Sequence, residues 1–269
     1  MQLGSSSLGG PVAAKPLRLA LWQGPSPAGD AALALETLRP ALQAAGRLGA
    51  ALLTAPEVYL PGYNHPEIAS LAQPRGGDWH RALAQMCREA QCGLVVGYAE
   101  RDGADVYNAS VAFDAQGREI AHYRKIQLYG PREKAIYRPG EAYATFDLNG
   151  TRAALLICYD IEFAPHVAAL AAQGVTLILT ATANMLPFTH VSRYSVPAMA
   201  AHHAVSIVYA NYCGSEGDLT YSGASLIAGP DGEVLALAGT SPALLIADLA
   251  SPDRHLLSTQ AQDLRIIPA

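Results

Sequence analysis

Three shortages in this sequence of 269 residues each exclude a class of protein. Its four cysteines form no CxxC pair, and a chain of this length does not depend on disulfides, so a reducing compartment, the cytoplasm, is favoured. No apolar stretch approaches the ~20 residues that span a bilayer, which argues against a membrane protein. The formal net charge is −5 and no run of like charges occurs, which argues against a nucleic-acid partner.

What the sequence does contain is apolar volume, because 51% of its residues are hydrophobic although only 7% are aromatic. That proportion is enough for a large core, and the length lies within the range of one α/β domain. Residues 1–16 are rich in Gly and Ser and lack the basic start and apolar centre of a signal peptide, so we expect a flexible leader there. We expect residues 17–269 to form a single domain.

Short apolar runs alternate with segments of helical periodicity along the chain. Two hairpins with glycine in the turn interrupt this alternation, one in each half of the chain. The halves therefore share one pattern, which predicts an α/β domain of two packed sheets covered by helices. The expected strands are 17–23, 51–55, 93–98, 107–114, 119–124, 143–148, 151–158, 175–181, 206–211, 224–228 and 233–238, and the expected helices are 30–50 (with Pro40 inside), 79–91, 165–173 and 191–203.

Three chemically active side chains come directly after expected strands. Cys158 ends the apolar run 153–157, Glu57 follows 51–56, and Lys125 follows 122–124. A thiol, a carboxylate and an ammonium at strand ends can meet at one edge of a sheet. Taken singly, each has a plainer interpretation, because buried cysteines are mostly inert packing and strand-end charges are mostly solvated.

These segments resemble the three signature blocks of the nitrilase (carbon–nitrogen hydrolase) superfamily. The resemblance rests on the order and spacing of all three blocks and extends over nearly the whole chain. Within the superfamily the chain most resembles bacterial aliphatic amidases of the 5-aminopentanamidase kind. The segments that carry the resemblance are Pro56-Glu57, Gly62-Tyr63-Asn64, Tyr123-Arg124-Lys125, Pro139-Gly140, Ile157 to Phe163, Thr182 to Met185 and Tyr209 to Gly214.

The resemblance implies a four-layer αββα sandwich, often paired as a homodimer. It also implies that Cys158 is the nucleophile, Glu57 the general base and Lys125 an oxyanion stabiliser. Glu133 matches a fourth family position, a glutamate that hydrogen-bonds the lysine or orients the substrate amide. A salt bridge in an ordinary loop is the alternative interpretation of Glu133, because it lies in Pro131-Arg132-Glu133-Lys134.

The expected chemistry is covalent hydrolysis of an amide with no metal or organic cofactor. Glu57 takes the thiol proton, and Lys125 and the backbone N–H of Tyr159 stabilise the oxyanion. Tyr59, Tyr63 and Asn184 follow strand ends near this site and are candidates for lining the pocket. His202-His203 does not indicate a metal site, because adjacent helical residues point in different directions and no third ligand lies at useful spacing.

One stretch departs from the family. Residues 199–203 read Met-Ala-Ala-His-His, where members usually carry Arg-Ala-x-Glu-Asn. The departure leaves the expected catalytic residues untouched. It bears instead on local packing, oligomer geometry and the pocket wall.

The predicted function is hydrolysis of a short aliphatic carboxamide, including ω-amino carboxamides, to the acid and ammonia. The expected partner is therefore a small-molecule amide. A nitrilase acting on a small nitrile and an N-carbamoyl amine hydrolase are alternatives, since both use the same residues. A binding protein without activity on the same scaffold is a third class, which the intact Glu57, Lys125, Cys158 and Glu133 oppose.

Overall fold

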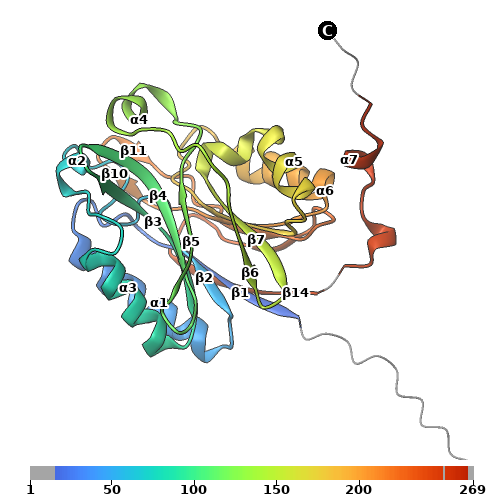
Figure 1. The fold of residues 1–269 in the computed structure, drawn as a ribbon, viewed down its shortest axis with the longest axis horizontal. Coiled ribbons are helices and arrows are strands. Elements are labelled where there is room, and N and C mark those ends of the chain that lie inside the picture. Colours follow the sequence, from blue (N-terminus) through green and yellow to red (C-terminus); the bar gives the residue numbers. More distant parts are fainter. Residues whose placement is uncertain (1–15, 251, 266–269) are drawn as a thin grey trace, which may run out of the picture.

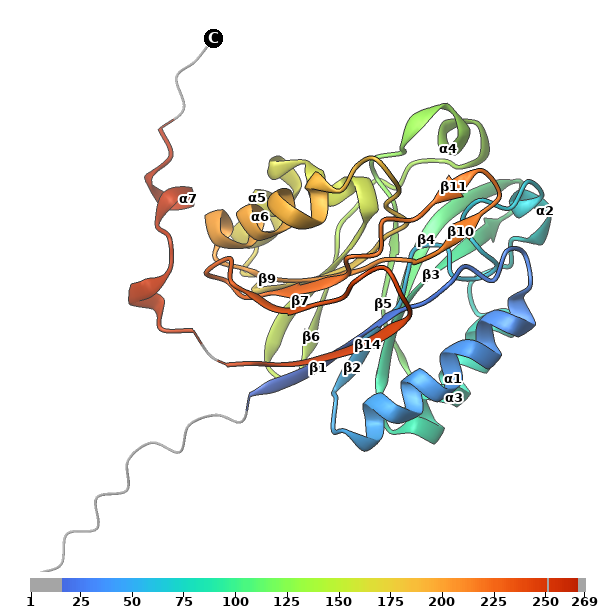
Figure 2. The same cartoon turned by 180° about the vertical axis from the view of Figure 1, so that it is seen from behind.

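Two six-stranded mixed sheets pack face to face, and helices cover both outer faces (Figures 1 and 2). The computed structural model describes residues 16–250 and 252–265. This arrangement confirms the expected αββα sandwich. Residues 1–15 of the expected leader lie outside the described residues, and the single-domain assignment of 17–269 stays a prediction.

The first sheet is assembled around three parallel strands from the first half of the chain. β1 pairs with β2 and β2 with β3 in parallel, while the outer pairs are antiparallel. The edge strand β14, from the far end of the chain, pairs with β1 and was not expected from the sequence. In spatial order the strands are β14 (Ala243–Leu249), β1 (Leu17–Gln23), β2 (Leu52–Thr54), β3 (Gly93–Asp102), β4 (Asp105–Phe113) and β5 (Glu119–Arg124).

The second sheet repeats this plan with the second half of the chain. Its central strands β7, β8 and β9 are parallel, and its outer pairs are antiparallel. In spatial order the strands are β13 (Val234–Leu237), β12 (Leu226–Ala228), β9 (Ser206–Ala210), β8 (Leu177–Ala181), β7 (Thr151–Ile157) and β6 (Ala144–Leu148). A small hairpin, β10 (Ser215–Glu216) with β11 (Leu219–Thr220), stands apart from both sheets.

Helices close the outer faces of both sheets. In α1 (Ala31–Arg47) the buried residues recur at helical spacing, and the Asp30 side chain caps the first turn by accepting the N–H of Leu33 at 2.9 Å. The helix continues through Pro40. Figure 2 shows α1 beside α3 (Asp78–Ala90) on the first sheet, and α5 (Ala164–Ala172) beside α6 (Val196–His203) on the second.

Several short helices lie outside the expected set. The expected helix at 191–203 begins with a π-helical turn, η2 (Val191–Ser195), before α6. The other additions are α2 (Ile68–Leu71), α4 (Gly130–Ile136), the 3₁₀ turns η1 (Cys158–Glu162) and η3 (Arg254–Leu256), and α7 (Gln260–Asp263). In the part of the chain that the structure describes, no helix has the length and apolar character to cross a membrane.

The buried apolar side chains form two clusters. One joins the first sheet to α1 and α3, and the other includes side chains from both sheets together with those of α5 and α6. Leu19, Leu21 and Val95 from the first sheet pack with strands of the second. Every residue of β7 from Ala153 to Ile157 is fully buried, because helices cover one face of this strand and the other sheet covers the opposite face. The carboxyl ends of β2 and β7 are therefore held rigidly at the same rim.

Candidate active site

Cys158 stands at a sharp turn where β7 ends and η1 begins. Its φ is +46°, a left-handed conformation that is uncommon for a residue with a side chain. The buried carboxylate of Asp160 holds this turn, accepting hydrogen bonds from the Ile157 N–H at 3.1 Å and from the Tyr123 hydroxyl at 2.8 Å. The turn thus presents the thiol at the strand end instead of burying it in the sheet.

Glu57 lies in the loop that follows β2, pressed against the neighbouring strand β3. A Cβ atom at Gly97 would fall 2.3 Å from the backbone nitrogen of Val58, so only glycine permits this approach. The Glu57 N–H donates at 3.3 Å to the carbonyl of Thr182, which directly follows β8, and the Tyr212 hydroxyl donates to the Glu57 carbonyl at 2.8 Å. Both sheets therefore fix the position of this carboxylate.

Lys125 joins two buried carboxylates. Its Nζ donates to Glu57 Oε1 at 2.7 Å and to Glu133 Oε1 at 2.8 Å, and all three side chains are at most 1% exposed. Asn108 Nδ2 also donates to Glu57 Oε1, at 2.7 Å. Glu57 Oε2, by contrast, has no hydrogen-bond partner among the described residues, so one oxygen of this carboxylate is free to accept a proton.

Glu133 belongs to this buried cluster and not to a surface loop. It lies on α4, and its carboxylate accepts the Tyr63 hydroxyl at 2.7 Å as well as the Lys125 ammonium. Its second oxygen accepts the Tyr129 N–H at 2.8 Å. The alternative interpretation, a salt bridge in an ordinary loop, does not describe this geometry, because Glu133 lies on a helix and is buried.

Burial and neighbouring charge set the ionisation of the cluster. Burial, with the nearby Glu133 charge, raises the pKa of Glu57 despite the opposing effect of Lys125. Burial acts to lower the pKa of Lys125, but Glu133 and Glu57 raise it well above its ordinary value, so the lysine stays charged. Burial and the Glu57 charge also raise the pKa of the Cys158 thiol, although Lys125 opposes this. The resting site therefore holds a thiol that needs a base.

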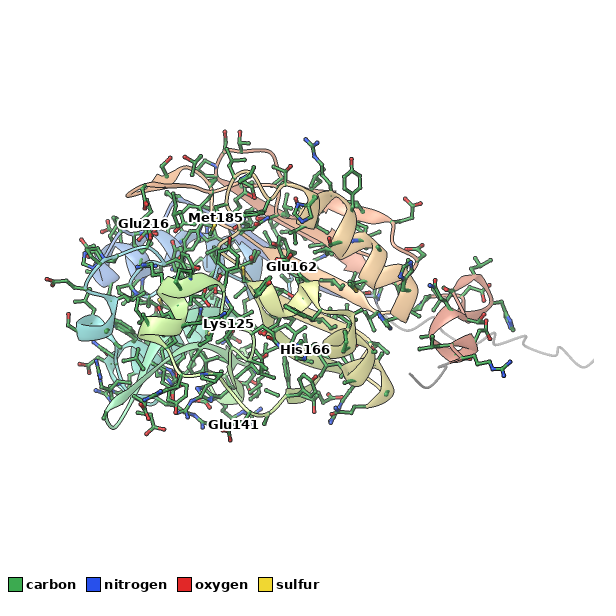
Figure 3. All side chains as sticks on the ribbon, turned by 90° about the horizontal axis from the view of Figure 1, so that it is seen from above. Lys125, Glu141, Glu162, His166, Met185 and Glu216 are labelled. Atoms are coloured by element: carbon green, nitrogen blue, oxygen red, sulfur yellow. The ribbon has the colours of Figure 1, made fainter. Side chains whose placement is uncertain are left out.

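A cavity of about 240 Å³ opens directly over Cys158. The expected residues Tyr159, Tyr63 and Asn184 line it together with residues that the sequence did not point to. In Figure 3, seen from above, Lys125, Glu162 and Met185 lie in the middle of the molecule, whereas Glu141 lies at its edge. The lining residues are Tyr63, Tyr129, Cys158, Tyr159, Glu162, Asn184, Met185, Phe188 and His190.

Tyr59 is placed differently from the expectation. It is 1% exposed, stacks on Tyr212 with ring centroids 5.9 Å apart, and is absent from the described residues that line the cavity. The cause is Val58, whose φ of +43° turns the chain after Glu57 and sends the next side chain into the core. Tyr59 therefore packs in the core against Tyr212 and is not among the residues that line the cavity.

Two residues that support the site were missed by the sequence reasoning. Asn108 is a polar residue within the apolar strand β4, where it hydrogen-bonds Glu57. Asp160 comes two residues after the thiol, the position from which a short side chain caps a turn. Both carried a signal, since a polar side chain in a buried strand or turn requires a hydrogen-bond partner.

The remaining histidine pair and the altered stretch lie on α6. In residues 16–250 and 252–265, no group of three or more His, Cys, Asp or Glu side chains is placed to hold a metal ion. The stretch 199–203 forms regular helix despite its departure from the family sequence, with Ala200 buried against the second sheet. None of these five residues lines the described cavity.

Residues 18–256 match the carbon–nitrogen hydrolase family. The chain belongs to this family. The resemblance expected from the three sequence blocks is thereby confirmed, and the protein is a carbon–nitrogen hydrolase of the nitrilase superfamily. The site described above brings together a cysteine, a carboxylate and a lysine, which is a combination suited to covalent catalysis by an activated thiol.

Relatives agree in sequence and in structure. A hydrolase encoded in the pqqF 5′ region of Pseudomonas protegens is 38% identical over 248 residues, covering 90% of this chain and 85% of that protein. An amidase variant from Nesterenkonia sp. AN1, solved with acrylamide added at its active-site cysteine, is 33% identical with a TM-score of 0.85, covering 93% and 96% of the two chains. A cysteine-to-alanine variant of that amidase, solved in complex with butyramide, is 32% identical with a TM-score of 0.86, covering 93% and 95%.

Proposed function

We propose that this carbon–nitrogen hydrolase is an amidase that cleaves a short aliphatic carboxamide, including ω-amino carboxamides, to the acid and ammonia through a thioester on Cys158. The observation that carries the proposal is the buried cluster of Glu57, Lys125 and Glu133, with the Glu57 and Lys125 charges acting on the thiol at the floor of the cavity. We further propose that the enzyme is cytoplasmic and forms a homodimer.

The first step is attack of the Cys158 sulfur on the amide carbonyl carbon. Glu57 takes the thiol proton, for which its unpartnered Oε2 is available. The carbonyl oxygen becomes an oxyanion, which the Lys125 ammonium and the Tyr159 N–H stabilise. The Tyr159 N–H belongs to the first turn of η1, where backbone donors have no partner within the turn.

The second step breaks the carbon–nitrogen bond. The oxyanion collapses, protonated Glu57 gives its proton to the leaving nitrogen, and ammonia departs, leaving a thioester on Cys158. Glu57 then takes a proton from water as the oxygen attacks the thioester, and the thiolate leaves and recovers that proton. The carboxylic acid is released and the enzyme returns to its starting state. The raised pKa of Glu57 suits a residue that both accepts and donates a proton.

Glu133 positions the other groups. It is hydrogen-bonded to Lys125 and to the Tyr63 hydroxyl, so it holds the ammonium just beneath the cavity floor and fixes Tyr63, which lines the cavity. Its charge keeps Lys125 protonated while Glu57 cycles between its two forms. Because the cavity measures about 240 Å³, it suits a small substrate of the size of butyramide, the ligand of the related amidase.

The test is an ammonia-release assay over a panel of substrates. The panel contains butyramide, hexanamide, 5-aminopentanamide, the corresponding nitriles and an N-carbamoyl amine, each with the wild-type enzyme and with Cys158→Ala. We expect release from the amides by the wild type alone, and accumulation of an acyl adduct on residue 158 after a rapid quench. Turnover of the nitriles or of the carbamoyl amine, with none of the amides, would overturn the proposal.

A further inference from the structure

One charged side chain in the cavity has no part in the mechanism. Glu162 closes η1, four residues after Cys158, and both residues line the same cavity. At the rise of a 3₁₀ helix, about 2 Å per residue, the two positions are separated by roughly 8 Å along the turn. A group bound at Glu162 therefore lies apart from the reacting carbonyl but in the same cavity.

The Glu162 carboxylate has no partner of its own. Among the described residues none hydrogen-bonds to it or pairs with it within 4.0 Å, although its side chain is half-buried in the wall. Burial raises the pKa of Glu162, and the neighbouring His190 and Lys125 offset only part of that effect. An anion in this position is stabilised when a cation binds beside it.

Aromatic rings surround the same part of the cavity. Tyr129 packs edge-on against Tyr159 and Phe188, with ring centroids 5.3 Å and 6.1 Å apart. Aromatic faces attract ammonium groups and also bury alkyl chains. A wall of rings with one carboxylate fits a chain that is apolar along its length and positively charged at its end.

The other charged residues around the cavity also favour a substrate whose distal end is positively charged. The residues that line the cavity include no lysine or arginine, and His190, which does line it, is exposed to solvent. Beneath the floor, Lys125 is matched by two carboxylates, so the buried cluster supplies no net positive charge to attract an anion. A substrate with a distal carboxylate would meet the Glu162 carboxylate, and no lysine or arginine lines the cavity to offset the repulsion.

We propose that Glu162 determines specificity by binding a positively charged distal group of the substrate, so that the preferred amides carry an ammonium several methylene groups from the carbonyl. This inference rests on the proposed amidase function and names the substrate class for that site. Glu162 makes its contact in the wall of the cavity, and the reacting atoms are handled by the residues at the floor.

The experiment compares two substrates of equal length. Hexanamide has a methyl group where 5-aminopentanamide has its ammonium, so the ratio of their kcat/KM values isolates the charge. We expect the wild type to favour the amino amide by about 10-fold or more, the range for a hydrogen bond to a charged group. In Glu162→Gln this ratio falls by about 10- to 100-fold, chiefly through KM of the amino amide.

The matched control removes the same charge elsewhere. Glu141 is exposed and stands at the edge of the molecule in Figure 3, away from the labelled cavity residues. Glu141→Gln keeps the wild-type ratio. A second variant, Glu162→Arg, reverses the wall charge, and it shifts the preference from 5-aminopentanamide toward adipic acid monoamide.

The outcomes separate this inference from the function on which it depends. If the wild type hydrolyses hexanamide and 5-aminopentanamide equally well, or if Glu162→Gln preserves the ratio, the role of Glu162 is wrong and the amidase assignment stands. If the wild type releases ammonia from neither amide, the proposed function itself fails. Equal changes in Glu162→Gln and Glu141→Gln would indicate a general effect of net charge and would also overturn the inference.

Discussion

Two buried carboxylates in this protein have cationic partners yet opposite ionisation behaviour. Glu57 and Glu100 are both at most 1% exposed, and their partners Lys125 and Arg124 are adjacent in sequence. Burial raises the pKa of Glu57 above its ordinary value. For Glu100, burial is outweighed by hydrogen bonds from His122 and Arg124, which lower the pKa to about 2.

The difference lies in how the donors are distributed. Both oxygens of Glu100 are bonded, Oε1 to Arg124 at 2.6 Å and Oε2 to His122 at 2.7 Å. In Glu57 both donors converge on Oε1, and Oε2 is left unpartnered. Lys125 must in addition serve Glu133. A carboxylate with both oxygens hydrogen-bonded has a structural role, whereas one with an unpartnered oxygen is available for proton transfer.

Strand geometry separates the two clusters. Successive side chains point to opposite sides of an extended chain, so Arg124 and Lys125 diverge at the end of β5. Arg124 lies over the Tyr107 ring at 3.8 Å and remains partly exposed, while Lys125 is fully buried. Two adjacent residues therefore belong to different ion pairs, Arg124 to a structural pair with Glu100 and Lys125 to the candidate catalytic pair with Glu57.

Removing the nucleophile gives the largest expected effect on this comparison. Cys158→Ala should lower kcat by about 10⁴-fold or more, because the covalent step is lost, with little change in the unfolding free energy. Steady-state ammonia release and urea denaturation measure the two quantities. Residual turnover within 10-fold of wild type would mean that the cluster of Glu57 does not work through this thiol.

Removing the base tests Glu57 directly. Glu57→Gln keeps the shape and the contact with Lys125 but cannot accept a proton, so kcat should fall by about 10²–10⁴-fold. Single-turnover acylation, followed by mass of the adduct on Cys158, should slow by the same factor. A variant that loses only substrate affinity would show that Glu57 binds and does not transfer protons.

Substitution of Glu100, whose two oxygens are both hydrogen-bonded, should lower stability and leave activity nearly unchanged. Glu100→Gln weakens its bonds to Arg124 and His122, so the unfolding free energy should fall by about 1–3 kcal/mol, discounted because Arg124 is 28% exposed. Urea denaturation measures this, and kcat per folded molecule should stay within about twofold. Asp102→Asn is the control, since Asp102 is 62% exposed and its pair with Arg124 should contribute under about 1 kcal/mol.

The pH dependence of kcat/KM is the smallest expected effect, and it tests directly whether the pKa of Glu57 is raised. Glu57 must be ionised to act, and its pKa is raised, so kcat/KM for hexanamide should fall with decreasing pH through a value above the ordinary ~4.3 of a glutamate. The raised pKa of Cys158 moves the alkaline limit above the ordinary ~8.5 of a thiol. If kcat/KM instead falls at low pH with a pKa at or below the ordinary value of a glutamate, the unpartnered oxygen of Glu57 does not explain how this residue works.

Much of the fold could be predicted from the sequence because periodicity and turn residues were clear. The strand that ends at Ile157 and the two hairpins appear at the expected positions. The edge strand β14 was missed because its residues are only half-buried and its partner β1 lies 230 positions away at Arg18–Asp248. Pairing over such a distance leaves no local signal.

The sequence predicted the site residues that directly follow strands. It predicted less well the residues whose positions depend on the conformation of loops. The structure places Glu57, Lys125 and Glu133 in one hydrogen-bonded cluster beside Cys158, as the sequence blocks suggested. Tyr59 was misplaced because a single positive φ redirects the chain after Glu57. The aromatic wall was missed because its rings come from separate loops and converge only in the folded protein.

The left-handed backbone at Cys158 has a consequence for how this enzyme can be altered. A side chain held in that conformation costs on the order of 1–2 kcal/mol, and glycine avoids the cost. Cys158→Gly should therefore give a more thermostable protein than Cys158→Ala, although both are inert. At this residue, stability favours glycine, whereas catalysis requires the cysteine that the sequence carries.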